Sequence, residues 1–207
     1  MKKQFINQLR RQLKQPLPGI EAQSIMMVSP KPVFQKNISK EAIKPSAVLI
    51  ILFFENNSWN FFLTKRSQSV SHHKGQISLP GGKLERGESL QQAALRESEE
   101  EIGIISKNIH IIGALSYFNV PVSNFKILPF IGWIKDKPNL KIHDKEVEKV
   151  FSISIEKFIL KSTQKTKYEN LNGRKLKIPY FDIDNEIVWG ATSIILSEFK
   201  RVILNIK

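Results

Sequence analysis

The sequence of 207 residues predicts an α/β or α+β sandwich, in which strands both precede and follow a central helix. Two segments support this fold class. The run SAVLIILFF at residues 46–54 is β-branched and aromatic, which is typical of a buried strand. Residues 89–102 contain no Gly or Pro and are rich in Leu, Ala, Gln and Glu, which predicts a helix.

Residues 1–45 are expected to form an N-terminal helix and loop extension to a domain that covers residues 46–207. Apolar residues with helical spacing occupy residues 5–13. The turn-forming motif PLPG follows at residues 16–19. Residues 20–45 include prolines and show little periodicity, so we expect a loop there.

The domain begins with a predicted hairpin, formed by residues 46–54 and a second strand at residues 61–66. Residues 76–82 are a short strand that runs into a glycine turn. The central helix is expected to end at Gly103, because glycine favours the position after a helix. The elements expected next are strands at residues 109–118, 125–133 and 148–153, a short helix at 154–160 with Ser154 as a candidate N-cap, an edge strand at 176–184, and a last helix at about 191–206.

Composition and charge limit the classes of function. Thirty-two Lys and Arg against nineteen Asp and Glu give a formal net charge of +13, which favours polyanionic partners. The basic residues are scattered and are not interleaved with aromatic residues, so we expect no nucleic-acid partner. The chain has no cysteine for a disulfide or a thiolate metal site. Its apolar stretches are too short to span a bilayer and no signal peptide is visible, so we expect a cytoplasmic location and no membrane partner.

Glu97, Glu100 and Glu101 are spaced so that they lie on one face of the central helix. Carboxylate oxygens are the ligands that Mg²⁺ and Mn²⁺ prefer. This face is therefore a candidate metal site. A solvated acidic face is the alternative interpretation of these glutamates taken by themselves.

The complete pattern around the helix resembles the Nudix box, Gx5Ex7REUxEExGU. The residues that match its fixed positions are Gly82, Glu88, Arg96, Glu97, Glu100, Glu101 and Gly103, with Ile104 as the final aliphatic residue. Ser98 replaces the usual aliphatic residue, and we expect this small side chain to pack against the sheet. The resemblance implies a Nudix α/β/α sandwich with a mixed sheet. It also implies hydrolysis of a nucleoside diphosphate linked to another moiety.

Carried over to this chain, the resemblance assigns Glu97, Glu100 and Glu101 as ligands of Mg²⁺ or Mn²⁺, with the backbone carbonyl of Gly81 as a further ligand. Glu97 also corresponds to the residue that orients or deprotonates the attacking water. Glu146 occupies the place of a further acidic residue that reaches the metals from a loop, and a surface charge is the alternative. The residues expected to shape the loop and helix are Gly82, Glu88, Arg96 and Gly103. Arg96 is expected to neutralise Glu88, about two turns earlier, and to hold the loop against the helix.

Residues 62–82, FLTKRSQSVSHHKGQISLPGG, resemble the signature of the coenzyme A (CoA) pyrophosphatase subgroup, LLTxRSx3Rx3Gx3FPGG. The matching residues are Leu63, Thr64, Arg66, Ser67, Gly75, Pro80, Gly81 and Gly82, and the departures are Phe62, Ser71 and Leu79. The resemblance implies that the substrate is bound by Arg66, His73, Gly75 and Gln76. Ser71 replaces an arginine, a residue type that can bind phosphate through two parallel hydrogen bonds.

These resemblances imply divalent-metal-dependent hydrolysis of the pyrophosphate bond of CoA or acyl-CoA to 3′,5′-ADP and (acyl-)4′-phosphopantetheine. Ser71 keeps a second hypothesis open, a Nudix pyrophosphatase that acts on ADP-ribose, NADH or another nucleoside diphosphate derivative. A hypothesis of another class is a catalytically inactive RNA-binding or regulatory Nudix-fold protein. The charge favours this hypothesis and the complete glutamate set opposes it. The enzyme hypotheses require a small-molecule substrate as partner, and a homodimer is compatible with the sequence.

Overall fold

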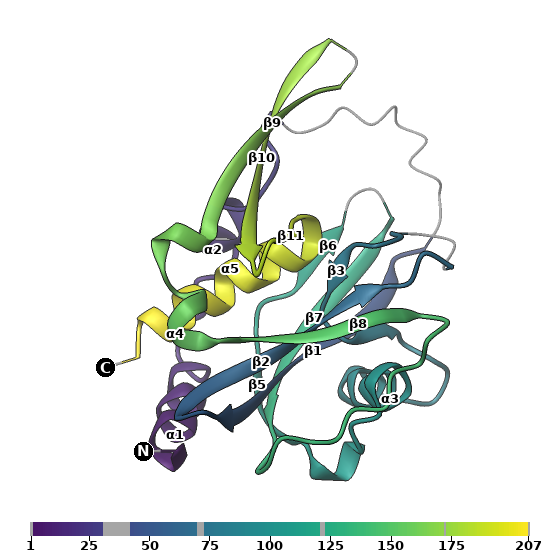
Figure 1. Ribbon diagram of the computed structural model, residues 1–207, viewed down its shortest axis with the longest axis vertical. Coiled ribbons are helices and arrows are strands. Elements are labelled where there is room, and N and C mark those ends of the chain that lie inside the picture. The colour runs from purple at the N-terminus through teal and green to yellow at the C-terminus, as the bar shows by residue number, and fades with distance from the viewer. Residues whose placement is uncertain (1, 31–41, 70–72, 121–122, 172, 207) are drawn as a thin grey trace.

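The computed structural model describes residues 2–30, 42–69, 73–120, 123–171 and 173–206. Within these residues, eight strands form a large mixed sheet and three strands form a second sheet (Figure 1). The large sheet contains β1 (Lys44–Glu55), β2 (Ser58–Arg66), β3 (Ile77–Ser78), β4 (Gly81–Lys83), β5 (His110–Ala114), β6 (Phe118–Val120), β7 (Phe125–Trp133) and β8 (Val147–Ser154). The second sheet contains β9 (Gln164–Leu171), β10 (Arg174–Ile183) and β11 (Glu186–Val188). The helices are α1 (Lys2–Gln12), α2 (Gly19–Ser24), α3 (Leu90–Ile102), α4 (Ile155–Phe158) and α5 (Gly190–Leu204), with 3₁₀ turns η1 (Ser106–Asn108) and η2 (Lys161–Thr163).

Strand β1 is buried on both faces of the large sheet. Leu49 and Ile51 belong to an apolar cluster with Ala94 of α3, whereas Ile50 belongs to a second cluster with Phe199 of α5. Alternate residues of one strand therefore pack against helices on opposite sides, with α3 on one side and α5 on the other (Figure 1). This three-layer arrangement confirms the predicted α/β/α sandwich with a mixed sheet.

The large sheet opens at one end because β1 changes partners along its length. Residues 52–55 of β1 pair with β2, whereas residues 46–48 pair with β4. Strand β2 pairs with β3 at residues 64–65, beyond the hairpin. The two hairpin strands therefore separate, and Gly81 and Gly82 of β4 lie in the opening, in contact with α3.

Helix α3 has the boundaries that the sequence predicts. Ser89 and Gln92 form a reciprocal capping box, in which each side chain accepts a hydrogen bond from the other residue's backbone N–H. Gly103 ends the helix in the left-handed conformation, with φ of 73°. Ser98 is buried and donates a hydrogen bond to the carbonyl of Ala94 at 2.7 Å, so it packs against the sheet as expected.

The prediction of a loop at residues 20–45 is wrong where the structure forms helix α2, which ends at Ser24. This helix of six residues is too short to show a periodic pattern, and it is held by α5. The fully buried carboxylate of Glu198 accepts hydrogen bonds from Gly19 N at 3.1 Å, Gln23 Nε2 at 2.8 Å and Ser116 N at 3.2 Å. Within the rest of that loop, residues 31–41 lie outside the described residues, and residues 44–45 already belong to β1.

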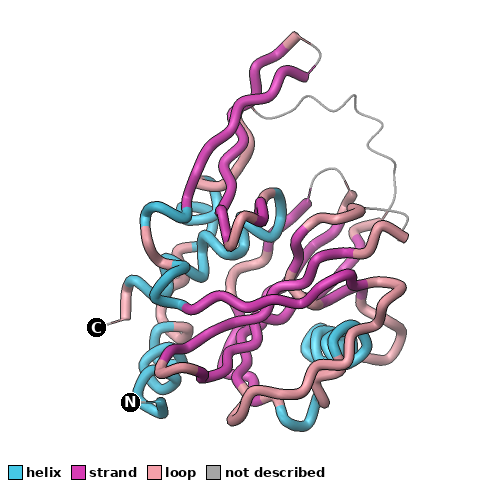
Figure 2. Tube along the Cα trace, viewed as in Figure 1, coloured by secondary structure: helices cyan, strands magenta, loops and turns pink. Residues whose placement is uncertain are grey.

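Two strand predictions also differ from the structure. The segment at residues 109–118 is divided into β5 and β6. Strand β10 is not an edge strand, because β9 pairs with it on one side and β11 on the other. Polar β9 has no alternating apolar residues that would have predicted it. The β9–β10 hairpin extends away from the helices, as the magenta strands in Figure 2 show. No helix in the described part of the chain is long and apolar enough to cross a membrane.

Candidate active site

Gly81 and Gly82 allow β4 to approach α3 closely. A Cβ atom at Gly82 would lie 2.2 Å from Oε1 of Glu97. A Cβ atom at Gly81, whose φ is 150°, would lie 2.3 Å from the carbonyl oxygen of Ala47. The backbone N–H of Gly81 also donates to Oε2 of Glu101 at 3.3 Å. The glycine pair therefore brings backbone groups directly against two of the predicted metal ligands.

Arg96 connects the loop before α3 with the glutamates of the helix. Its Nη2 lies 2.9 Å from Oε1 of Glu88, as the sequence predicts, and its Nη1 donates to Glu97 at 3.0 Å and Glu100 at 2.9 Å. The hydrogen bond from Arg96 and that from Glu85 N hold the pKa of the Glu88 carboxyl below its usual range. One guanidinium therefore fixes both the loop and two predicted ligands.

Glu101 is the most deeply placed of the three glutamates, with 3% of its surface exposed. Burial and the negative charge of Glu97 raise the pKa of Glu101 to about 8, although the N–H of Gly81 and the charge of Arg66 oppose this shift. Burial also raises the pKa of Glu97, against the opposing effect of Arg96. Two neighbouring carboxylates are thus incompletely compensated by the positive groups around them.

In the part of the chain that the structure describes, no three His, Asp or Glu side chains converge closely enough to hold a metal ion. Glu97 and Glu100 instead share Nη1 of Arg96. The residue types nevertheless fit a divalent cation, because both carboxylates already surround one cationic nitrogen and the charge of Glu101 is only partly compensated. Metal binding would require Glu97 and Glu100 to exchange contacts with Arg96 for contacts with the ion.

Glu146 lies on the loop before β8, close to α3. Its charge contributes to the raised pKa of both Glu97 and Glu101. Its carbonyl oxygen accepts a hydrogen bond from Ser67 N at 2.8 Å, which joins this loop to the end of β2. The sequence left open whether Glu146 reaches the metal-ligand candidates or is only a surface charge. In the structure, Glu146 lies near the carboxylates of Glu97 and Glu101. A catalytic role for Glu146 stays a prediction.

The four predicted substrate-binding residues come together at the base of one loop. Arg66 N donates to the carbonyl of Gln76 at 3.0 Å, and Gly75 N donates to the carbonyl of Arg66 at 3.1 Å. Nδ1 of His73 lies 2.9 Å from Oε1 of Gln76. Ser71 lies outside the described residues, so the effect of this departure from the signature stays a prediction.

Arg66 faces the carboxylates of α3 from this loop base. Its Nη1 lies 3.9 Å from Oε1 of Glu101. Its buried Nε atom has no hydrogen-bond partner among the described residues. A buried donor without a partner is unfavourable, so this guanidinium has hydrogen-bonding capacity for a ligand beside the carboxylates.

His143 is a neighbour of the site that sequence reasoning missed. Its backbone N–H donates to the carbonyl of Glu101 at 3.0 Å, and its Nδ1 lies 3.7 Å from Oε1 of Glu146. A single histidine in a lysine-rich segment has no characteristic spacing, so the sequence contained no signal for this position.

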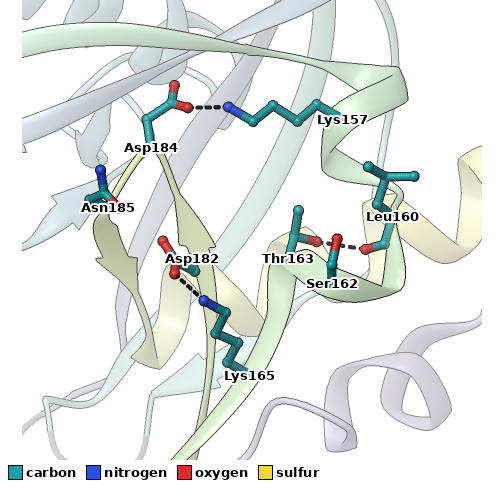
Figure 3. Close-up of a pocket in the computed structure, with 8 residues that line it drawn as sticks. All are labelled: Lys157, Leu160, Ser162, Thr163, Lys165, Asp182, Asp184 and Asn185. Atoms are coloured by element: carbon teal, nitrogen blue, oxygen red, sulfur yellow. Dashed lines mark hydrogen bonds and ion pairs between the residues drawn. The ribbon is translucent and has the colours of Figure 1, made fainter.

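A hollow of about 350 Å³ lies elsewhere, and Figure 3 shows its lining. Ion pairs between Lys157 and Asp184 and between Lys165 and Asp182 neutralise its charged side chains internally. None of the predicted site residues lines this hollow. The lining residues are Lys157, Leu160, Ser162, Thr163, Lys165, Asp182, Asp184 and Asn185.

Known proteins share both the sequence pattern and the fold. Residues 43–172 match the family model of the NUDIX domain. Nudix hydrolase 3 of Caenorhabditis elegans is 31% identical over 176 residues, which cover 76% of this chain and 72% of the relative. The mitochondrial Nudix hydrolase 15 of Arabidopsis thaliana is 34% identical over 161 residues, or 74% of this chain. The aligned region spans only 56% of that plant protein.

A solved structure supports the fold over nearly the whole chain. A MutT/nudix family protein from Enterococcus faecalis matches with a TM-score of 0.56 and 19% identity. The match covers 98% of this chain and 74% of the other. At this level of identity the likeness concerns the fold, so the chemistry depends on the residues described above.

Proposed function

The chain belongs to the Nudix hydrolase family, and from this premise we propose that it is a CoA diphosphatase. It hydrolyses the pyrophosphate bond of CoA or acyl-CoA to 3′,5′-ADP and (acyl-)4′-phosphopantetheine. The observation that carries the choice of substrate is the match of residues 62–82 to the CoA signature. The contacts of Arg66 support it, since its buried Nε has no hydrogen-bond partner among the described residues and its Nη1 lies 3.9 Å from Oε1 of Glu101.

In the proposed reaction, water attacks one phosphorus of the diphosphate, and the bond to the bridging oxygen breaks. That oxygen leaves with the other phosphate. Glu97, Glu100, Glu101 and the Gly81 carbonyl would hold Mg²⁺ or Mn²⁺, and the bound ion would supply positive charge that stabilises the phosphate oxygens. Glu97 orients the water and accepts its proton.

The other residues bind and position the substrate and the ligands. Glu146 assists Glu97 from the loop before β8. Arg66 donates hydrogen bonds to phosphate oxygens, with the backbone of Gly75 and the side chains of His73 and Gln76 beside it. Arg96 and Glu88 hold the loop against the helix, which keeps Glu97 at a fixed distance from Gly82.

The test compares CoA and acetyl-CoA with ADP-ribose, NADH and dATP, each with Mg²⁺ or Mn²⁺, and identifies the products by mass. Glu100→Gln and Glu101→Gln are the test variants. Glu99→Gln is the matched control on the same helix, because its carboxylate accepts a hydrogen bond from Ser106 N at 2.9 Å instead of facing the site.

Release of 3′,5′-ADP from CoA, lost in both test variants and kept in the control, is the expected result. Preferred turnover of ADP-ribose or NADH would overturn the CoA assignment and keep the family chemistry. That outcome would agree with a pocket altered by Ser71. Salt-dependent RNA binding without any hydrolysis would instead identify an inactive RNA-binding protein.

A further inference from the structure

We propose that Trp189 and Lys167 form a subsite for the adenine ring and the ribose 3′-phosphate of the substrate. The inference rests on the proposed function, because it assigns a place to the adenosine end of CoA. Trp189 stands at the corner between β11 and α5, and 37% of its surface is exposed. Among the three tryptophans of the chain it alone is exposed, since Trp59 is buried and Trp133 is partly buried.

Two side-chain contacts place this corner beside the substrate-binding loop. Glu186, three residues before Trp189, pairs with Lys65 at 3.2 Å. Thr192, three residues after it, donates a hydrogen bond to the carbonyl of Ile77 at 3.0 Å. Lys65 and Ile77 are the sequence neighbours of Arg66 and Gln76. Trp189 therefore lies between two attachments to the strands that carry the proposed phosphate-binding residues.

The side chains of Trp189 and Lys167 suit a ligand that has both an aromatic ring and a negative charge. The Nζ atom of Lys167 lies over the Trp189 ring, 5.8 Å from its centroid. Lys167 also pairs with Glu169 at 2.7 Å, in a partly exposed contact of the kind that contributes little and exchanges easily. An indole face next to an ammonium group can stack on a base and bind a nearby phosphate.

The dimensions of CoA agree with this placement. Its adenine is joined to the diphosphate through one ribose, so the base must lie near the phosphate-binding residues. The pantetheine arm leaves from the other phosphate and has no aromatic ring for Trp189 to stack on. The corner is therefore assigned to the nucleoside end of the substrate.

A second aromatic–cation pair on the same sheet provides a matched control. Nζ of Lys175 lies 4.7 Å from the ring centroid of Tyr168. Tyr168 and Lys167 are consecutive in β9, so their side chains project from opposite faces of the sheet. Among the residues that the structure describes, no side-chain contact joins this second pair to β2 or β3, and we expect no role for it in substrate binding.

The experiment measures steady-state kinetics with CoA and dephospho-CoA, and binding of 3′,5′-ADP and 5′-AMP by calorimetry. Trp189→Ala should raise KM for CoA and Kd for 3′,5′-ADP about tenfold, with kcat nearly unchanged. Lys167→Gln should raise both constants a few-fold, up to about fivefold, only for ligands that carry the 3′-phosphate. Tyr168→Ala and Lys175→Gln should match the wild type.

Tryptophan fluorescence provides an independent measurement. Binding of 3′,5′-ADP should quench the emission, and Trp189→Phe should remove this quenching while keeping a ring that can stack. If Trp189→Ala fails to fold by circular dichroism, Trp189→Phe and Lys167→Gln decide the question.

The possible results distinguish failure of the proposed subsite from failure of the proposed CoA hydrolysis. Hydrolysis of CoA with unchanged KM and Kd in the Trp189 and Lys167 variants would overturn the subsite alone. If wild-type protein left CoA intact but bound 3′,5′-ADP through Trp189, the proposed function would fail and the subsite would stand. Equal effects of the control pair would overturn the assignment to this corner.

Discussion

The carboxylate of Glu97 lies in the space that a side chain at Gly82 would occupy, with Oε1 2.2 Å from the position of an added Cβ atom. The absence of a side chain at Gly82 therefore leaves room for the carboxylate of Glu97, which is a candidate metal ligand. Since 14 residues separate them in the sequence, this contact depends on the packing of α3 against β4.

Gly82→Ala should displace Glu97 and lower kcat by about a hundredfold, because a misplacement of about 1 Å has an effect of this size on a catalytic group. The measurement is CoA hydrolysis at saturating metal. Glu99→Gln is the control, since its carboxylate accepts a hydrogen bond from Ser106 N instead of facing the site. Full activity of Gly82→Ala would contradict the proposed role of Glu97.

Arg96→Lys should weaken activation by Mg²⁺ by about 10- to 100-fold, as is common when a residue that orients metal ligands is changed. Lysine retains the charge but cannot contact Glu88, Glu97 and Glu100 together through a planar fork. The measurement is the metal concentration for half-maximal activity. Arg86→Lys, on the exposed surface of the same loop, should leave that concentration unchanged.

Metal binding should become tighter as the pH rises towards about 8, because the protonated Glu101 carboxyl must lose its proton to bind a cation. The raised pKa means that the metal-free folded protein holds a proton that the unfolded chain has released above its usual pKa of 4.5. The free energy of unfolding of the metal-free protein therefore falls as the pH rises through this window.

Calorimetry with Mn²⁺ and denaturant unfolding at several pH values measure the two effects of Glu101. Glu101→Gln should flatten the pH dependence of stability between pH 4.5 and about 8. A wild-type stability that increases with pH in this window, by an amount that Glu101→Gln removes, would show that the sign is wrong.

Glu198→Ala should lower the free energy of unfolding by about 3 kcal/mol or more, because one buried and two partly buried donors lose a charged acceptor. The measurement is urea unfolding, combined with the rate of proteolytic cleavage near α2. Glu169→Ala, at an exposed position of β9, should change stability by about 0.5 kcal/mol or less. Equal stabilities of the two variants would mean that α2 does not depend on this carboxylate.

Local chemistry made α3 and its surroundings predictable. The Ser89–Gln92 box and Gly103 set the ends of the helix through contacts within one turn. The spacing of Glu97, Glu100 and Glu101 follows directly from the helical repeat. The contact of Arg96 with Glu88 was also predicted, because both residues belong to one short motif. The apolar run of β1 similarly predicted a buried strand.

Contacts between distant segments decided the remaining features. Strand β9 is polar and forms because β10 supplies its backbone partners, and β10 becomes central because β11 pairs with its other edge. Helix α2 depends on Glu198, which lies 175 residues from Gln23. Such pairing leaves no periodic signal in either partner.

By itself, the sequence determined the family, the carboxylate pattern of α3 and the identity of the glycines beside it, because these depend on residue type and short spacing. Only the tertiary structure decided that Glu146 approaches Glu97 and Glu101 and that Trp189 stands beside the Arg66 loop. Both placements depend on how the sheet opens and how α5 packs beneath it. Those arrangements result from burial of apolar surface over the whole domain, which no short stretch of sequence encodes.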